Sequence, residues 1–277
     1  MSLKTGITMV RRSLSLTALL LALFVAAPQA SAGRYDLDLS RLWNNNTSGK
    51  DATLLSEGLI GDLGAALAPR FLGPAATYGA LGFQIALDYA MTNFDSTTDQ
   101  WTTVLDDTDP GMFHTGSLVI RKGLPFSTEV GGRITKLFES KLWGVGMELK
   151  FAPLEGFQKL PEIAFRGTVS TFLGSDDYAI LTAGGDLNIS KKIGIGGVFK
   201  LAPFLGYNFL YVHGSSNVIS IGYQNGELQQ QVFDPVHAFK HFAVMGFQLY
   251  ATAVNLGFEA SITKGIQTYA FRFGTEF

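Results

Sequence analysis

The chain has no cysteine among its 277 residues. It therefore has no disulfide, no thiolate metal site, no cysteine nucleophile and no cysteine to carry a lipid anchor. After residue 32 it also has no apolar run that approaches the roughly 18 residues of a membrane-spanning helix. Hydrophobic residues nevertheless make up 47% of the chain. We therefore expect the apolar residues to follow a pattern other than a long helix.

Basic residues are not in excess, because 21 Lys and Arg stand against 23 Asp and Glu. Three of the basic residues, Lys4, Arg11 and Arg12, precede an apolar run at 14–27 and the sequence Ala-Ser-Ala at 30–32. This order is typical of a secretory signal peptide. Its removal leaves 18 basic and 23 acidic residues, a net charge of −5. That balance gives no electrostatic reason to expect nucleic-acid binding.

The last ten residues alternate between an apolar and a polar face, as in a strand with lipid on one side and water on the other. The apolar face carries Tyr269, Phe271, Phe273, Thr275 and Phe277. The polar face carries Thr268, Arg272, Gly274 and Glu276. The carboxy terminus is therefore predicted to be a membrane-crossing β-strand.

Alternating strands that end in an aromatic residue resemble the Gram-negative outer-membrane β-barrel proteins. The likeness is close over the last ten residues and architectural elsewhere, and Thr275 occupies a position where that family usually has a bulkier apolar residue. The resemblance implies an outer-membrane location after signal-peptide removal, with lipid and the barrel insertion machinery as partners. It also implies that an insertion signal is formed by Tyr269, Phe271, Phe273 and Phe277.

Ten segments have the alternation and the roughly 9–11 residues that a tilted membrane-crossing strand needs. They are 81–91, 113–121, 126–135, 142–151, 162–172, 178–190, 196–211, 239–251, 254–262 and 267–277. We predict an all-β fold with a single antiparallel transmembrane barrel of about ten strands, with eight or twelve as alternatives. The longest connections, 92–112 and 212–238, are the first and seventh, and odd-numbered connections lie outside the cell when both barrel ends are periplasmic.

The residues before the strands carry a different periodicity. Leu55, Leu59, Leu63 and Leu67 recur every four residues and Pro69 follows, which predicts a short amphipathic helix at 55–67. The chain thus divides into a signal peptide (1–32), an amino-terminal periplasmic or plug segment (33–78) and a barrel (79–277). Two interpretations of the helix stay open: it lies against the periplasmic mouth or bilayer interface, or it plugs the barrel and moves during transport.

Strand alternation places a set of charged residues inside the barrel. The set consists of Asp88, Glu129, Arg133, Glu148, Arg166, Asp186, Glu259 and Arg272. Hairpin geometry predicts that Arg166 lies near Asp186 and that Glu259 lies near Arg272. A salt-bridge network that fills a narrow barrel is one interpretation, and a charged constriction that selects solutes is the other. Ten strands enclose little more than the eight that side chains can fill, which favours the first.

The first long connection is acidic and has no basic residue between 92 and 112. It holds Asp95, Asp99, Asp106, Asp107 and Asp109. Such a loop attracts cations, but the spacing matches no calcium motif, so we expect a solvated acidic loop rather than a metal site.

The four histidines, His114, His213, His237 and His241, are predicted near the outer rim, where an outer-membrane hydrolase would carry its catalytic groups. No catalytic motif accompanies them, so we assign no catalytic residue and no cofactor. We predict a small passive channel or transport protein for small solutes, possibly plugged. The alternatives are a structural or surface-binding barrel that acts through loops 92–112 and 212–238, and a hydrolase at the rim.

Overall fold

The computed structural model describes residues 35–36, 49–94, 101, 111–157, 159–175, 178–216, 220–224, 227–231 and 234–277. Arg34–Phe277 form one compact unit. The elements in chain order are α3 (Gly49–Leu67), β1 (Phe83–Phe94), β2 (Met112–Leu124), β3 (Thr128–Leu137), β4 (Trp143–Leu154), β5 (Glu162–Leu173), β6 (Tyr178–Ser190), β7 (Ile193–Ile195), β8 (Phe199–Ser216), β9 (Ser220–Gln224), β10 (Glu227–Gln231), β11 (Val236–Ala251), β12 (Val254–Thr263) and β13 (Ile266–Glu276). The predicted signal peptide lies outside the described residues.

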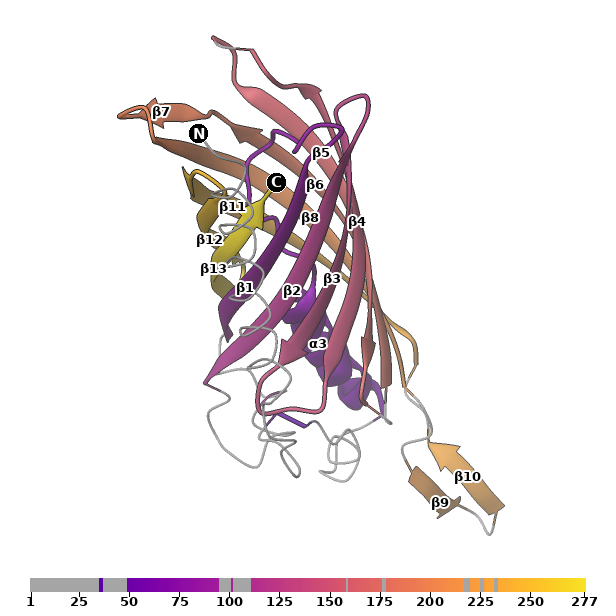
Figure 1. Cartoon of the computed structure of the whole chain (residues 1–277). Helices are drawn as coiled ribbons and strands as arrows, with labels where there is room; N and C mark the ends of the chain where they lie inside the picture. The colour runs from indigo at the N-terminus through magenta and orange to yellow at the C-terminus, as the bar shows by residue number, and fades with distance from the viewer. Residues whose placement is uncertain are drawn as a thin grey trace. The chain divides into compact units, whose positions relative to one another are not determined.

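Ten strands close into an antiparallel barrel (Figure 1). Neighbouring strands follow the order β11, β12, β13, β1, β2, β3, β4, β5, β6 and β8, and β8 pairs again with β11. The first and last strands meet with Asp88 opposite Arg272. The short β7 pairs with β8 beyond the barrel wall, and β9 and β10 form a separate two-stranded sheet. The predicted fold class and strand number are confirmed.

The strand limits differ from prediction most clearly at 196–211. β8 begins at Phe199 because Gly196 and Gly197, with φ of 61° and 76°, turn the chain out of β7. These backbone angles favour glycine, since a side chain is strained there. At its other end β8 continues to Ser216, paired with β11 as far as Gly214 and with β6 as far as Ser216.

The barrel wall has an apolar outer face and a polar inner face, as the alternation predicts. On β4, for example, Met147 and Leu149 are 67% and 59% exposed, whereas Glu148 and Lys150 between them are buried at 6% and 5%. Because successive side chains of a strand point to opposite faces, this difference fixes which residues face the lumen.

The two ends of the barrel differ. At one end, here called the terminal end, the N–H of Phe83 donates to the carbonyl of Phe277 at 3.0 Å, and the N–H of Phe277 donates to the carbonyl of Phe83 at 2.9 Å. At the other end, called the loop end, lie the two longest connections, 95–111 and 217–235. The connections at the terminal end are shorter, as in bacterial barrels whose termini face the periplasm.

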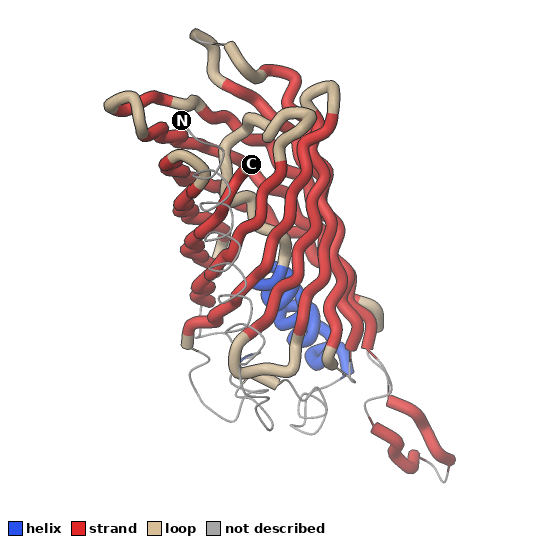
Figure 2. The backbone as a smooth tube through the Cα atoms, viewed as in Figure 1, coloured by secondary structure: helices blue, strands red, loops and turns tan. Residues whose placement is uncertain are grey.

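The helix α3 lies inside the barrel, in its loop-end half (Figures 1 and 2). It ends at Leu67 as predicted and begins six residues earlier than predicted. A methyl group added to Gly64 would lie 2.6 Å from a methyl of Val212 on β8, and one added to Gly61 would lie 3.1 Å from Ala238 on β11. The helix therefore packs directly on the inner wall, and not against the barrel mouth or the bilayer interface.

Among the described residues, no helix has the length and apolarity that would let it cross a membrane.

Candidate functional site in the barrel lumen

Residues 68–78, here called the lumen segment, follow α3 and continue without regular secondary structure through the barrel interior. Most of them are buried. A buried backbone outside a helix or sheet leaves its N–H and C=O groups without partners, at a cost of about 1–3 kcal/mol for each unsatisfied group. The partners of this backbone therefore show what positions it.

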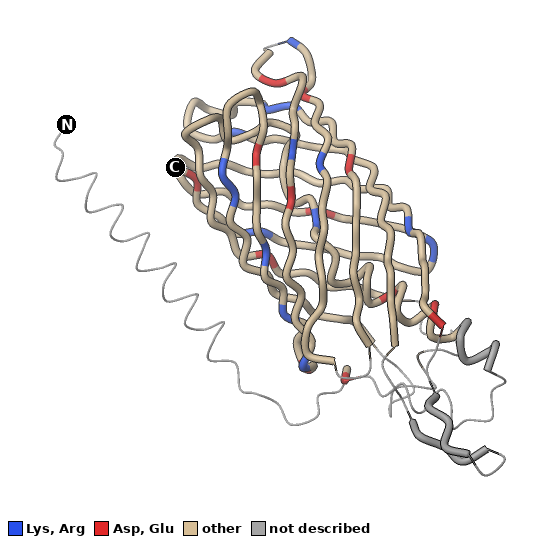
Figure 3. The backbone as a smooth tube through the Cα atoms, turned by 90° about the vertical axis from the view of Figure 1, so that its right-hand side faces the viewer, with Lys and Arg blue, Asp and Glu red and all other residues tan. Residues whose placement is uncertain are grey.

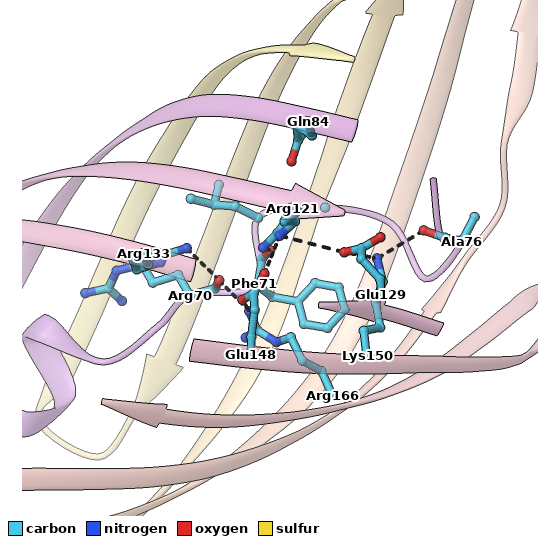
Figure 4. Close-up of polar contacts among 12 residues, drawn as sticks. Arg70, Phe71, Ala76, Gln84, Arg121, Glu129, Arg133, Glu148, Lys150 and Arg166 are labelled. Atoms are coloured by element: carbon cyan, nitrogen blue, oxygen red, sulfur yellow. Dashed lines mark hydrogen bonds and ion pairs between the residues drawn. The ribbon is translucent and has the colours of Figure 1, made fainter. Parts of the chain in front are cut away.

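Side chains of the barrel wall donate hydrogen bonds to the carbonyl groups of the lumen segment. In chain order, Pro69 O accepts from Arg166 Nη2 (3.3 Å), Arg70 O from Arg133 Nη2 (3.0 Å) and Arg166 Nη1 (2.7 Å), Phe71 O from Arg121 Nη2 (3.0 Å), Leu72 O from Arg272 Nη1 (2.5 Å), Gly73 O from Asn188 Nδ2 (2.9 Å) and Ala76 O from Lys150 Nζ (3.1 Å). Figure 4 shows several of these contacts converging on Arg70, Phe71 and Ala76. Charged donors make the stronger class of hydrogen bond, so the wall holds the segment through its main chain.

The N–H groups of the same segment donate to oxygen atoms of the barrel. Leu72 N donates to Glu259 Oε2 at 2.5 Å, Ala75 N to Ser190 Oγ at 2.9 Å and Thr77 N to Glu155 Oε2 at 2.7 Å. Both kinds of backbone group are therefore satisfied by the wall, which suits an irregular chain in a water-poor interior.

The cations that hold the segment are themselves paired with carboxylates. Arg166 Nε lies 2.8 Å from Asp186 Oδ2, and Arg166 Nη1 lies 2.7 Å from Glu148 Oε2. Glu148 also accepts from Arg121. One carboxylate thus bridges two arginines, and the predicted proximity of Arg166 and Asp186 is present as an ion pair.

A second group of ion pairs joins the first and last strands. Arg272 donates from Nε to Asp88 Oδ1 and from Nη2 to Asp88 Oδ2, both at 2.7 Å, and Arg133 lies 3.1 Å from the same carboxylate. In the register of β12 and β13, Arg272 lies opposite Gly257 and Glu259 opposite Ala270, so Glu259 and Arg272 are diagonal neighbours as predicted. The carboxylate of Glu259 nevertheless accepts from the lumen segment and does not form the ion pair with Arg272. Closure of the barrel supplies Asp88 instead.

All eight lumen residues selected from the sequence are buried, with exposed fractions between 2% and 7%. Two cations, Arg121 and Lys150, complete the wall network, which then holds five basic and five acidic residues. Basic and acidic positions are interspersed along the wall (Figure 3). Lys150 shares the inward parity of Glu148 on β4, and Arg121 shares that of Ser117 on β2. No periodic signal marked Arg70, because it lies in no regular element.

The lumen segment leaves little space in the barrel. The larger of two cavities holds about 30 Å³ and is lined by Arg70, Phe71, Asp186, Asn208, Glu259 and Ser261, among others. The second holds about 10 Å³. A cavity of at least about 10–15 Å³ is needed for one water molecule. These two cavities therefore have no room for a solute larger than a few water molecules.

The chain before α3 is fixed at the loop end. Tyr35 is 3% exposed, its ring centroid lies 4.4 Å from that of Phe113, and its N–H donates to the carbonyl of Glu139 at 3.0 Å. The helix itself is held there by Asp62, whose carboxylate accepts from Trp101 Nε1 at 3.1 Å. The amino-terminal segment is thus anchored near one mouth and continues through the lumen toward the other.

The histidines lie on the outer face of the wall. His114, His241 and His237 hydrogen-bond through Nδ1 to the hydroxyl groups of tyrosines on neighbouring strands. These tyrosines are Tyr89, Tyr207 and Tyr211, at 2.7, 2.6 and 2.6 Å respectively. Amphipathic rings favour a membrane interface because one part is apolar and another polar. These pairs have the character of an aromatic belt.

Two further predicted sites have different outcomes. The aspartates of the first long connection, Asp95, Asp99, Asp106, Asp107 and Asp109, lie outside the described residues. The residues of the predicted insertion signal lie on β13 and at the carboxy terminus, where Tyr269, Phe271 and Phe277 are 37%, 44% and 57% exposed. Among the described residues, no group of three or more His, Asp or Glu side chains is arranged to hold a metal ion.

Solved structures similar to this chain are Gram-negative outer-membrane β-barrel proteins. They include an outer-membrane channel from Pseudomonas putida F1 (8% identity, 76% of this chain and 100% of that one, TM-score 0.43), the KdgM porin (8%, 69% and 99%, TM-score 0.33) and the attachment invasion locus protein Ail of Yersinia pestis (14%, 72% and 99%, TM-score 0.28). No protein-family model and no curated protein matches the chain. The pairing of its own strands, rather than these likenesses, defines the barrel.

Proposed function

We propose that the protein is an outer-membrane channel for small solutes whose lumen is closed by its own residues 33–78. The observation that carries this proposal is the row of wall side chains that donate to six carbonyl groups of the lumen segment. In this proposal the terminal end faces the periplasm and the loop end faces the outside, as in other bacterial barrels.

The balanced charge of the wall supports a closed resting state. An open constriction that selected solutes by charge would direct its charged groups toward water. Here Arg121, Arg166 and Arg272 each contact both a carboxylate and the lumen segment. Removal of the segment would leave these cations facing open lumen, which would then have the polar lining of a pore.

Conductance in planar lipid bilayers tests the proposal. The mature full-length protein is expected to give few or no openings, and a variant without residues 33–78 is expected to give steady channels. Since that deletion removes partners of buried charges, a second variant, Gly64→Val, displaces α3 from Val212 while it leaves the rest of the chain intact. Large, steady channels from the full-length protein would contradict closure by the segment.

A structural or surface-binding barrel is the second candidate, and one observation favours it. The hairpin β9–β10, inside the predicted outer loop 212–238, pairs Glu227 with Gln224 and forms a sheet separate from the barrel. A hairpin beyond the wall can present a surface to a partner. Absence of ion conductance in bilayers for the full-length protein, the deletion variant and Gly64→Val would favour this candidate over a channel. A hydrolase at the rim has less support, because three histidines pair with tyrosine hydroxyls.

A further inference from the structure

We propose that the barrel lumen is a binding site for a peptide segment without regular secondary structure, and that residues 68–77 are its present occupant. The ligand class is a peptide with an arginine–aromatic–leucine tripeptide that precedes residues with small side chains. This inference rests on the proposed closure of the lumen by residues 33–78, because it names the class of ligand that the closed lumen recognises.

The first argument is that the contacts are directed to the main chain. Six carbonyl groups and three N–H groups of the segment bond to wall side chains. These backbone groups are the same in every peptide, apart from the missing N–H of proline. In known modes of peptide recognition, main-chain hydrogen bonds supply affinity and side-chain pockets supply specificity. The wall therefore holds the segment largely through groups that every peptide carries.

The second argument is that two adjacent side chains fill defined pockets. Arg70 Nη2 donates to Thr92 Oγ1 at 3.1 Å, and the residue is only 9% exposed. The ring of Phe71 lies 4.7 Å from the guanidinium carbon of Arg166 and 6.0 Å from the ring of Phe204. A cation over an aromatic face is attractive, and more so when both are removed from water. Arg70 and Phe71 are thus the specificity-determining positions of the occupant.

The third argument is that little space is left for side chains at positions 73, 75 and 76. A methyl group on Gly73 would lie 3.3 Å from Gln248 Oε1 and 3.6 Å from Arg121 Nη1. Ala75 is completely buried and Ala76 is 8% exposed. There is no room at these positions for a longer side chain without movement of the wall. The site therefore selects against bulky side chains at positions 73, 75 and 76.

The fourth argument concerns the link between the segment and the barrel. After Thr77 the chain reaches an exposed turn at 79–81, where Leu81 is 92% exposed. A protease recognition sequence inserted between Ala80 and Leu81 would separate the occupant from the barrel without alteration of a wall residue. The occupant could then be exchanged for another peptide.

The experiment uses the full mature chain with this insertion, folded in detergent and cleaved. A fluorescent synthetic peptide of residues 66–78 is added under mild urea, and anisotropy reports its binding. We expect saturable binding. A peptide with Pro74→Ala should bind within about threefold of the native peptide, and one with Arg70→Ala and Phe71→Ala should bind at least about tenfold more weakly.

Two wall variants serve as a matched pair. Asn188→Ala removes the donor to Gly73 O and should weaken binding of every peptide, whereas Gln267→Ala on the outer face of β13 should change nothing. If the cleaved barrel does not stay folded, the uncleaved chain gives a second readout. Hydrogen exchange of residues 68–77 should then rise more for Arg70→Ala with Phe71→Ala than for Pro74→Ala.

The outcomes separate this inference from the channel. Failure of every peptide to bind, together with channels from the variant without 33–78, would overturn the peptide site and leave the channel proposal standing. Equal loss of affinity for all sequence changes would overturn main-chain recognition. A scrambled peptide that binds as tightly as the native one would overturn the Arg70–Phe71 anchor. Peptide binding without conductance in any variant would support the peptide site and contradict the channel.

Discussion

The guanidinium group of Arg166 donates to the main-chain oxygen of Arg70 at 2.7 Å, across 96 positions of sequence. The same guanidinium contacts Asp186 and Glu148. Arg133 donates to the same main-chain oxygen at 3.0 Å, so this oxygen accepts from two guanidinium groups. The barrel wall and its amino-terminal segment therefore share one polar network. A substitution in either is expected to change the stability of both.

A double-mutant cycle should reveal coupling between Arg166 and Asp186. Arg166→Ala is expected to destabilise the barrel by about 3–5 kcal/mol, because it leaves a buried carboxylate without its partner. The same change in an Asp186→Ala background should cost less. Urea unfolding in lipid vesicles of the four proteins measures the difference, and strictly additive effects would show that the pair contributes no mutual stabilisation.

Substitution of the helix glycine that touches the wall should loosen the plug. Gly64→Val places methyl groups where Val212 already lies, and overpacking of this kind costs about 1–3 kcal/mol. We expect faster proteolysis of the amino-terminal segment and more frequent channel openings. Gly167→Val is the control, because Gly167 faces outward on β5 with no atom within 4 Å of an added methyl group. Equal effects of the two substitutions would contradict direct packing of α3 on β8.

Removal of Phe277 should block stable insertion while export continues. Phe277 and Phe83 exchange two main-chain hydrogen bonds where the barrel closes, and an unpaired strand edge does not persist in lipid. Fractionation of cells that express the truncated chain should show it absent from the outer membrane. Wild-type amounts of heat-modifiable barrel from the truncated chain would contradict this expectation.

Channels from the variant without 33–78 should prefer cations. Residues 79–277 hold 14 basic and 18 acidic residues, a net charge of −4, and the first long connection holds Asp95, Asp99 and Asp106 among five aspartates. A vestibule of one sign concentrates the opposite ion. Reversal potentials in a salt gradient measure the preference, and replacement of the five aspartates by asparagine should reduce it. An unchanged preference in that variant would assign selectivity to the wall instead.

Much of the barrel could be predicted from the sequence, because a strand between lipid and a polar interior repeats every two residues. The facing of Met147 and Glu148 follows from that period alone. The helix end at Leu67 follows from the leucine spacing and Pro69. These features are local, so the sequence carries them directly.

The remaining features depend on distant parts of the chain. The partner of Arg272 is set by closure of β13 on β1, which brings Asp88 opposite. The lumen segment has no periodic pattern of apolar residues, because it forms neither a helix nor a strand. Its backbone groups form hydrogen bonds with side chains of the wall. Gly61 and Gly64 weaken a helix by propensity, but in the barrel they allow its close approach to Ala238 and Val212. The low helix propensity follows from the sequence alone, whereas the close approach depends on where the helix lies in the barrel.

The anchoring of Tyr35 at the loop end sets the order of assembly. β1 begins at the terminal end, so the chain between Tyr35 and Phe83 traverses the ring of strands from one mouth to the other. The segment fills the ring of strands so far that the two cavities beside it hold only about 30 and 10 Å³. We therefore expect the strands to be laid down around a chain already in position, with the pairing of β13 and β1 as the step that makes the threading permanent.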